Sequence, residues 1–561
     1  MATKQHFWRR YAVAGATFVA GVAFAWYFLQ APPNRAPEPT VSPDRTSASD
    51  AALAASSPTP KLTPPPVAVS KAAPASGRNF QFKPPKGAAA HELTLQFPND
   101  TGLQAFLAKA RKAGVSVLGV IPQLNAVRVA VPGAAQAGQI LALAPDNTPV
   151  GYNNLVSNPK LPNSQGDNFG GPYANFGSNA LSWLGVTGDA SSWGSGVTVA
   201  VLDTGVNNIR GLDQKTIPQY NLLAQANDGA EPDMRHGTAM ASIIAGDDPT
   251  LPGIAQAAQL LSLRVLDESG GGDGFTVAQG IIDAVDRGAR VLSMSMGSPE
   301  GGPVMDAALN YALTRGVAIV AATGNDGLGE VSYPANYPGV IGVTAVDANG
   351  QRAQFANYGA EVALAAPGVG VSTPWTTGMA LNISGTSASV PFVSGAIAAV
   401  MSNNPGLSPQ AAANLLIKYA DDAGAPGPDP MYGAGILDLG RVMNRNTPNL
   451  NDAAVADIYY SPTYGPGGAP AIAVTVQNRG TTALANLQLD VTVDNKPKTF
   501  YIGSLVSGDI QSETIPLSNS QVNNPDGVTI TSQVSVSGIK DVTPGNNSKS
   551  VLLPGSKTTG S

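Results

Sequence analysis

The sequence predicts a multidomain chain whose largest part is an α/β domain with a parallel sheet and helices on both faces. Three observations lead to this fold class. The chain has 561 residues, too many for a single hydrophobic core. Between residues 165 and 445, short apolar runs alternate with helical segments, which is typical of a parallel sheet. Residues 446–553 alternate apolar and polar positions without a helical period, which predicts an all-β sandwich.

The strands of the α/β domain are expected where short apolar runs end in glycine or polar residues. They are residues 197–202, 259–265, 291–296, 318–322 and 340–345. A long apolar helix is expected at 392–401.

A small α+β unit is expected at residues 78–155, directly before the α/β domain. Polar and apolar residues alternate as in strands at 91–97, 115–121 and 126–131, and helical spacing appears at 103–113 and 134–144. His91, in the first of these strands, is expected to be a surface residue.

The N-terminus has the features of an export segment. Basic residues up to Arg10 precede the uncharged run 11–29, which is long enough to span a bilayer. The triplet Ala23-Phe24-Ala25 also fits a signal-peptidase site. Residues 1–30 are therefore interpreted as a membrane anchor or a cleaved signal peptide. The rest of the chain would then be anchored facing the periplasm or exterior, or secreted.

Composition restricts the remaining segments and the chemistry. Residues 31–77 contain eleven prolines among many alanines, serines and threonines, which predicts a disordered stalk. The tail 554–561 is also expected to be disordered. A net charge of -6 without a basic patch argues against a nucleic-acid partner. The absence of cysteine excludes disulfides, thiolate metal sites and a cysteine nucleophile.

Four polar residues lie where acyl transfer would need them. Asp203 ends a strand of the parallel sheet, at the edge where such sheets build their sites. His236 is the only histidine of the α/β region and could act as a general base. Asn325 follows the strand 318–322, and Ser387 precedes an apolar helix whose N-terminus offers backbone donors. Taken singly, each residue also fits a turn, a helix start or a helix cap.

Taken together, these residues and their order closely resemble the subtilisin-like serine proteases, or subtilases. The matching motifs are Asp203-Thr204-Gly205, His236-Gly237-Thr238, Gly324-Asn325 and Gly385-Thr386-Ser387. The resemblance implies an endopeptidase that acts on peptides or proteins. It implies the following roles: Ser387 as nucleophile, His236 as general base, Asp203 as the residue that orients His236, and Asn325 as an oxyanion-hole donor.

The resemblance has further implications for binding and maturation. A peptide substrate would bind as an added strand beside two segments, Ser295-Met296-Gly297 and Gly270-Gly271-Gly272. The unit at 78–155 resembles a subtilase propeptide, which implies a zymogen, inhibition by the chain's own propeptide and autocleavage within a loop region at 150–178. The sandwich resembles CARDB-type modules of exported bacterial proteins. Subtilases need no cofactor for chemistry and often bind structural calcium, but the resemblance identifies no calcium ligands in this chain.

Three alternatives remain at this stage. The run Gly385-Thr386-Ser387-Ala388-Ser389 also occurs in sedolisins, but those enzymes use glutamate and aspartate where this chain has His236 and Asn325. The chain could instead be an adhesion or binding protein that acts through the sandwich and uses the protease for maturation. A non-proteolytic hydrolase is disfavoured because the serine motif is not Gly-x-Ser-x-Gly.

Overall fold

The computed structural model describes residues 82–160, 173–223, 234–375 and 379–554. The expected anchor or signal peptide, the stalk at 31–77 and the tail after residue 554 lie outside these residues. Within the described ranges, no helix is long and apolar enough to cross a membrane.

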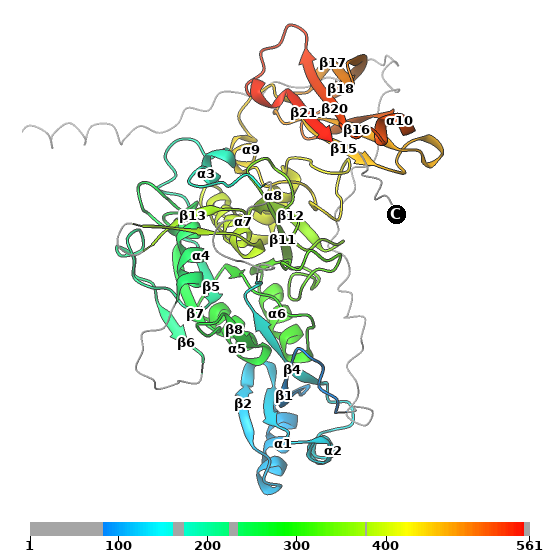
Figure 1. The fold of residues 1–561 in the computed structure, drawn as a ribbon. Coiled ribbons are helices and arrows are strands. Elements are labelled where there is room, and N and C mark those ends of the chain that lie inside the picture. Colours follow the sequence, from blue (N-terminus) through cyan, green and yellow to red (C-terminus); the bar gives the residue numbers. More distant parts are fainter. Residues whose placement is uncertain (1–81, 161–172, 224–233, 376–378, 555–561) are drawn as a thin grey trace, which may run out of the picture. The chain divides into compact units, whose positions relative to one another are not determined.

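The first unit is an antiparallel sheet with two helices (Figure 1). Its strands lie in the order β2 (Val117–Ile121), β3 (Ala126–Ala130), β1 (Ala88–Gln96) and β4 (Val150–Ser157). Its helices are α1 (Asp100–Lys112) and α2 (Ala134–Leu143). The side chain of Asn99 accepts a hydrogen bond from the N–H of Gly102 and so begins α1.

The strands and helices expected from the sequence of this unit are present, with one correction. Residues 150–157, predicted as part of a loop region, form the strand β4. Val150 and Val156 are buried and the chain between them is mostly polar, so the segment lacks the apolar run by which the other strands were found. β4 is a strand because it pairs with β1 on one side and with a distant segment on the other.

The central sheet is parallel throughout and has seven strands. Their order is β12 (Val362–Pro367), β11 (Ile341–Val346), β10 (Ala318–Ala322), β9 (Val291–Met294), β5 (Thr198–Asp203), β7 (Gln259–Arg264) and β6 (Gln219–Asn221). The five strands expected from the sequence lie together in the middle. The two additional strands, β6 and β12, form the edges.

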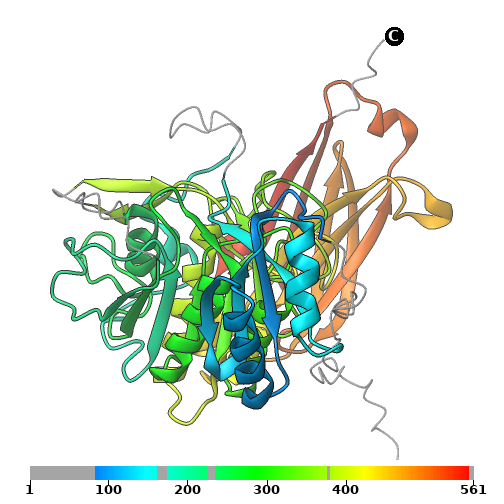
Figure 2. The same ribbon diagram turned by 90° about the horizontal axis from the view of Figure 1, so that it is seen from below.

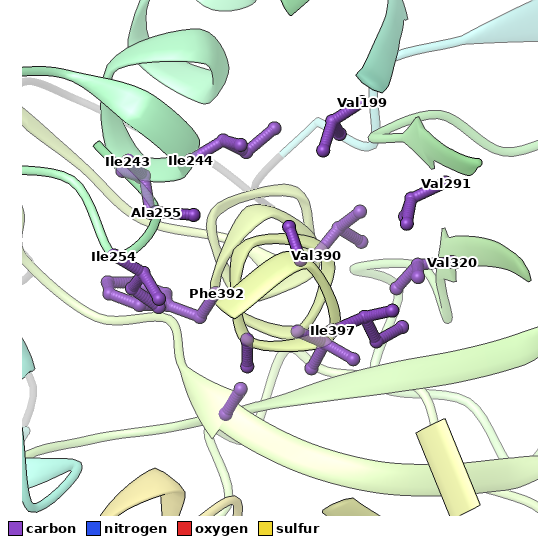
Figure 3. Close-up of a cluster of buried hydrophobic side chains, with 14 of the residues drawn as sticks. Val199, Ile243, Ile244, Ile254, Ala255, Val291, Val320, Val390, Phe392 and Ile397 are labelled. Carbon is purple, nitrogen blue, oxygen red and sulfur yellow. The ribbon is translucent and has the colours of Figure 1, made fainter. Parts of the chain in front are cut away.

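Alternate residues of each strand point to opposite sides of this sheet. Both faces carry apolar side chains, and helices bury both. Helices α4 (Arg235–Ala245) and α7 (Thr386–Ser402) pack on the face that includes Val199 and Val320, as Figure 3 shows with α7 at its centre. Helices α5 (Gly274–Asp286) and α6 (Pro303–Thr314) pack on the opposite face. The predicted α/β class with helices on both faces is confirmed.

Short elements complete this region. They are α3 (Ala180–Trp183), β8 (Gly271–Asp273), the antiparallel pair β13 (Val371–Pro374) and β14 (Ala380–Ile383), α8 (Pro409–Lys418) and α9 (Leu439–Asn444). β8 does not join the central sheet. It pairs with β4 and thereby extends the sheet of the first unit to five strands.

The C-terminal region consists of two antiparallel sheets, drawn in orange and red in Figure 2. One contains β15 (Ala453–Ser461), β16 (Ala471–Asn478) and β19 (Ile510–Pro516). The other contains β18 (Lys496–Leu505), β17 (Leu484–Val493), β20 (Val528–Val536) and β21 (Ser548–Leu553), with the short helix α10 (Asn519–Val522) before β20. Residues of both sheets share one apolar core, including Val474 and Leu489. This arrangement is the expected sandwich.

Charged and polar groups link the sandwich to the α/β region. Asp421 forms ion pairs with Arg441 at 2.8 Å and with Arg479 of the sandwich at 2.9 Å. The side chain of Gln477, in β16, accepts from the N–H of Asp422 and donates to the carbonyl of Ala420. These groups are buried or half-buried, so they join the two parts through specific bonds.

Candidate active site

Asp203 is the last residue of β5 and is almost fully buried, with 1% of its surface exposed. Its Oδ1 accepts a hydrogen bond from the N–H of Thr204 at 2.7 Å. The carboxylate therefore lies at the carboxyl end of a central parallel strand, the edge where open α/β sheets bind ligands.

His236 is the second residue of α4, and its ring lies next to the carboxylate of Asp203 at the carboxyl end of β5. Its Nδ1 lies 2.9 Å from both carboxylate oxygens of Asp203. Such a carboxylate favours the tautomer with the proton on Nδ1, which leaves the Nε2 lone pair free to accept a proton. Nε2 is buried and has no hydrogen-bond partner among the described residues.

A glycine allows this close approach of α4 to β5. A Cβ on Gly237 would collide with the carbonyl oxygen of Gly205 and come within 3.2 Å of the Asp203 Cβ. The N–H of Gly237 also donates to the hydroxyl of Thr204 at 3.1 Å. The glycines and the threonine of the two motifs therefore hold His236 against Asp203.

Ser387 is the second residue of α7, and its backbone N–H has no intrahelical acceptor at that position. Gly385 precedes the helix with a φ of 131°, a conformation that favours glycine. A Cβ at this position would lie 2.9 Å from Nδ2 of Asn325 and 3.1 Å from Oγ of Ser387. Gly385 therefore leaves room for both polar groups at the start of α7.

Asn325 follows β10, and its side-chain amide is held in one orientation. Its Oδ1 accepts from the N–H and from the hydroxyl of Thr386, each at 2.9 Å. With Oδ1 fixed in this way, Nδ2 donates to the carbonyl oxygen of Pro159 at 2.8 Å. The structure thus places Asp203, His236, Asn325 and Ser387 around the carboxyl ends of β5 and β10.

The chain itself occupies the cleft beside these residues. Residues Leu155–Ser157 pair antiparallel with β8 on one side. On the other side, Ser157 exchanges two hydrogen bonds with Gly297, at 2.9 and 2.8 Å. The N–H of Asn158 donates to the carbonyl of Gly270 at 2.9 Å. Both segments predicted to bind an extended peptide therefore contact residues 155–158.

The first unit is held over the cleft by polar contacts at the start of α5. Asn153 accepts from the N–H of Phe275 and donates to Asp273, and Arg128 forms an ion pair with Asp273 at 3.1 Å. Asp273 also caps α5 by accepting from the N–H of Thr276. Asn153 and Asp273 thus accept from two of the N–H groups at the start of α5 that have no partner within the helix.

A buried tyrosine and a half-buried aspartate lie beside the bound strand. Tyr333, which lines the same cavity as Val156, donates its hydroxyl to Oδ1 of Asp306 at 2.5 Å. Burial, followed by the nearby carboxylate, holds the pKa of Tyr333 well above its usual value. Burial also raises the pKa of Asp306. The tyrosine therefore stays protonated and remains a hydrogen-bond donor.

Comparisons with known proteins agree with this geometry. The family model described as the subtilase family matches residues 194–435. Subtilisin Savinase of Lederbergia lenta is 38% identical over 251 residues, which cover 44% of this chain and 89% of that protein. The thermostable alkaline protease of Halalkalibacterium halodurans is 36% identical over 256 residues, or 44% of this chain and 68% of that protein. The chain belongs to the subtilase family.

This subtilase is a serine endopeptidase, as its family and relatives show. The crystal structure of fervidolysin from Fervidobacterium pennivorans, a keratinolytic enzyme related to subtilisin, superposes with a TM-score of 0.56 at 18% identity. The match covers 85% of this chain and 92% of fervidolysin, and it shows a shared fold.

Some residues of the cleft were not anticipated from the sequence. Asn158 and Pro159 lie in a segment that was predicted only as a loop containing a cleavage site, and Thr386 was seen only as part of a motif. Their roles depend on contacts between positions at least 61 residues apart, which a local pattern does not show. Among the described residues, no group of three or more histidine or carboxylate side chains could hold a metal ion.

Proposed function

We propose that this subtilase is an exported endopeptidase, made as a zymogen, that hydrolyses peptide bonds through Asp203, His236 and Ser387. The carbonyl oxygen of Pro159, 2.8 Å from Nδ2 of Asn325, is the observation that carries the proposal. A carbonyl bound to a fixed amide donor next to a serine is in the position of a substrate about to be attacked.

In the proposed reaction, Ser387 Oγ attacks the carbonyl carbon while Nε2 of His236 removes the hydroxyl proton. Asp203 accepts a hydrogen bond from Nδ1 and stabilises the imidazolium that forms. The negative charge on the carbonyl oxygen is stabilised by Nδ2 of Asn325 and by the backbone N–H of Ser387. His236 then gives the proton to the leaving amine, and water hydrolyses the acyl-enzyme in the reverse sequence.

The same geometry supports inhibition by the chain's own first unit. A substrate strand would pair with β8 on one side and with Gly297 on the other. The end of β4 already makes both sets of bonds, those to Gly297 through Ser157. Release of the unit after self-cleavage would free both edges. The bond aligned with Asn325 is the one between Pro159 and Lys160, which we propose as the processing site.

Mutation of the proposed nucleophile tests the function. We expect Ser387→Ala in the full chain to abolish both peptide hydrolysis and self-cleavage, measured with a fluorogenic peptide and by intact mass. Ser182→Ala is a matched control, because Ser182 is exposed and its hydroxyl bonds only to the carbonyl of Asn179 within the described structure. Unchanged hydrolysis by the Ser387→Ala chain would refute the proposal.

Export and the route to it form a separate part of the proposal. The basic start and the uncharged run 11–29 support transport out of the cytoplasm. Cell fractionation followed by mass spectrometry of the N-terminus distinguishes a retained membrane anchor from a cleaved signal peptide. Recovery of the enzyme only in the cytoplasmic fraction would contradict export.

A further inference from the structure

The residue presented to Ser387 in the cleft is a proline, which lacks a hydrogen-bond donor that the strand pairing requires. In an antiparallel pair, residues that exchange two hydrogen bonds recur at every second position. Ser157 and Gly297 form such a pair, so the next would join residue 159 to Ser295. The N–H of residue 159 would donate to the carbonyl of Ser295, but Pro159 has no N–H.

The side chain of Asn158 supplies the missing donor. Its Nδ2 donates to the carbonyl oxygen of Ser295 at 2.8 Å, while its backbone N–H donates to Gly270. Ser295 is buried, with 1% of its surface exposed, so its carbonyl would lose a bond that water could not replace.

Gly270 leaves space for this side chain. It has a φ of 77°, and a Cβ there would collide with Oδ1 of Asn158 and lie 3.3 Å from its Cβ. The amide of Asn158 is thus confined between Gly270 and Ser295. Its confinement sets the position of the next residue, Pro159, whose carbonyl bonds to Asn325.

We propose that Asn158 is a positioning residue for self-cleavage, and that this enzyme accepts proline before the scissile bond when asparagine precedes the proline. This inference rests on the proposed proteolytic function. Ser387 Oγ forms an ester with the carbonyl carbon of Pro159 as the bond to the nitrogen of Lys160 breaks. The nitrogen of Lys160 receives the proton that His236 took from Ser387, and water then releases the carboxylate of Pro159.

A double-mutant cycle in the full chain tests this role. We expect Asn158→Asp, which keeps the shape but loses the donor, to slow self-cleavage at residue 159 about 10- to 100-fold. In a Pro159→Ala chain, the backbone N–H of residue 159 can donate to Ser295. The same Asn158→Asp change should then slow cleavage less than about threefold. Asn158→Ala should show the same coupling without adding a charge. Intact mass gives the cleavage site and the rate.

Peptides measure the same coupling if a variant chain fails to fold. Peptides with the sequence of residues 152–163 are given to the mature enzyme, with asparagine or aspartate at position 158 and proline or alanine at 159. The loss in kcat/KM on changing asparagine to aspartate should be at least tenfold with proline and small with alanine. Equal losses in the two series would overturn the inference.

Failure of the inference and failure of the proposed function give different results. If the wild-type chain cleaves neither itself nor a general peptide substrate, the proteolytic function is wrong. If it cleaves a general substrate but cuts its own chain elsewhere than after Pro159, or shows no coupling between positions 158 and 159, only the role of Asn158 is wrong.

Discussion

The hydroxyl of Ser295 donates a hydrogen bond to the main-chain carbonyl of Ser387, with 2.8 Å between the two oxygens. Pro391 explains why this carbonyl is available. In an α-helix the carbonyl of residue 387 would accept from the N–H of residue 391, which proline lacks. Both serines are buried, so the bond ties the first turn of α7 to the segment that binds the substrate strand.

We expect Ser295→Ala to lower kcat about tenfold, because the carbonyl of Ser387 would lose its donor and the start of α7 would loosen. Adding Pro391→Ala should restore part of the activity, since the N–H of residue 391 can then donate to that carbonyl. Steady-state kinetics and thermal melting of both variants check this. A double variant no more active than Ser295→Ala alone would contradict the account.

The amide of Asn325 gives a second prediction. Asn325→Ala should reduce kcat by about 10²–10³, because one donor to the developing oxyanion is lost while the substrate strand keeps its backbone bonds. Thr386→Val is the matched comparison. It removes one of the two bonds that orient the amide but leaves the N–H of Thr386 in place, so the loss should stay below about tenfold. Losses of equal size in the two variants would contradict this expectation. They would show that the amide donor gives no rate advantage without the hydroxyl of Thr386.

The central strands were predictable from the sequence because burial on both faces makes them continuous apolar runs. β10, for example, was expected at 318–322 and spans those residues. The edge strand β6 has three residues and exposed ends, so no apolar run marks it. The predicted helix 392–401 was too short, since α7 begins at Thr386. Pro391 is the sixth residue of α7, and a proline inside a helix gives the false appearance of a break; here the hydroxyl of Ser295 takes the place of its missing N–H.

The candidate site was predictable where residue types and short motifs identify it. Asp203, His236, Asn325 and Ser387 each carry a glycine or small-residue motif that the packing requires, as Gly237 and Gly385 illustrate. The contents of the cleft were not predictable. β4 lies more than 100 residues before Gly271 and Gly297, so no local pattern connects it with them. This polar segment is a strand because it pairs with the two segments that contain these glycines.

Burial differs sharply between two neighbouring residues of β4, which gives a third prediction. Val156 is 3% exposed and packs with Phe275 and Met296, whereas Leu155 is 50% exposed. Val156→Ser should slow self-cleavage roughly tenfold, because the strand would lose buried apolar surface that holds it in the cleft. Leu155→Ser should change the rate less than about twofold. The rates are measured by intact mass, and a larger effect of Leu155→Ser would show that the strand is bound in another register.

Asp422, where the sandwich meets the α/β region, gives a prediction about pH. Its Oδ1 accepts from the N–H of Gly427 at 2.9 Å, and Oδ2 is buried without a hydrogen-bond partner in the described structure. Burial raises the pKa of Asp422 from 3.8 to about 7, and the nearby carboxylates of Asp429 and Asp457 add to the rise. Burial likewise raises the pKa of Asp438.

Because the folded chain holds this proton more tightly than the unfolded chain does, the contribution of Asp422 to stability is fully present below about pH 4 and is lost as pH rises through 7. Asp422→Asn keeps an acceptor at Oδ1 and carries no charge. In the Ser387→Ala background, which prevents self-digestion, it should raise the Tm at pH 8 by roughly 2–4 °C for each kcal/mol gained and leave the Tm at pH 4 nearly unchanged. Asp526→Asn, at an exposed position of the sandwich, is the control and should alter neither value. A Tm that falls at pH 8 on Asp422→Asn would mean that the Asp422 carboxylate is ionised there and stabilises the fold.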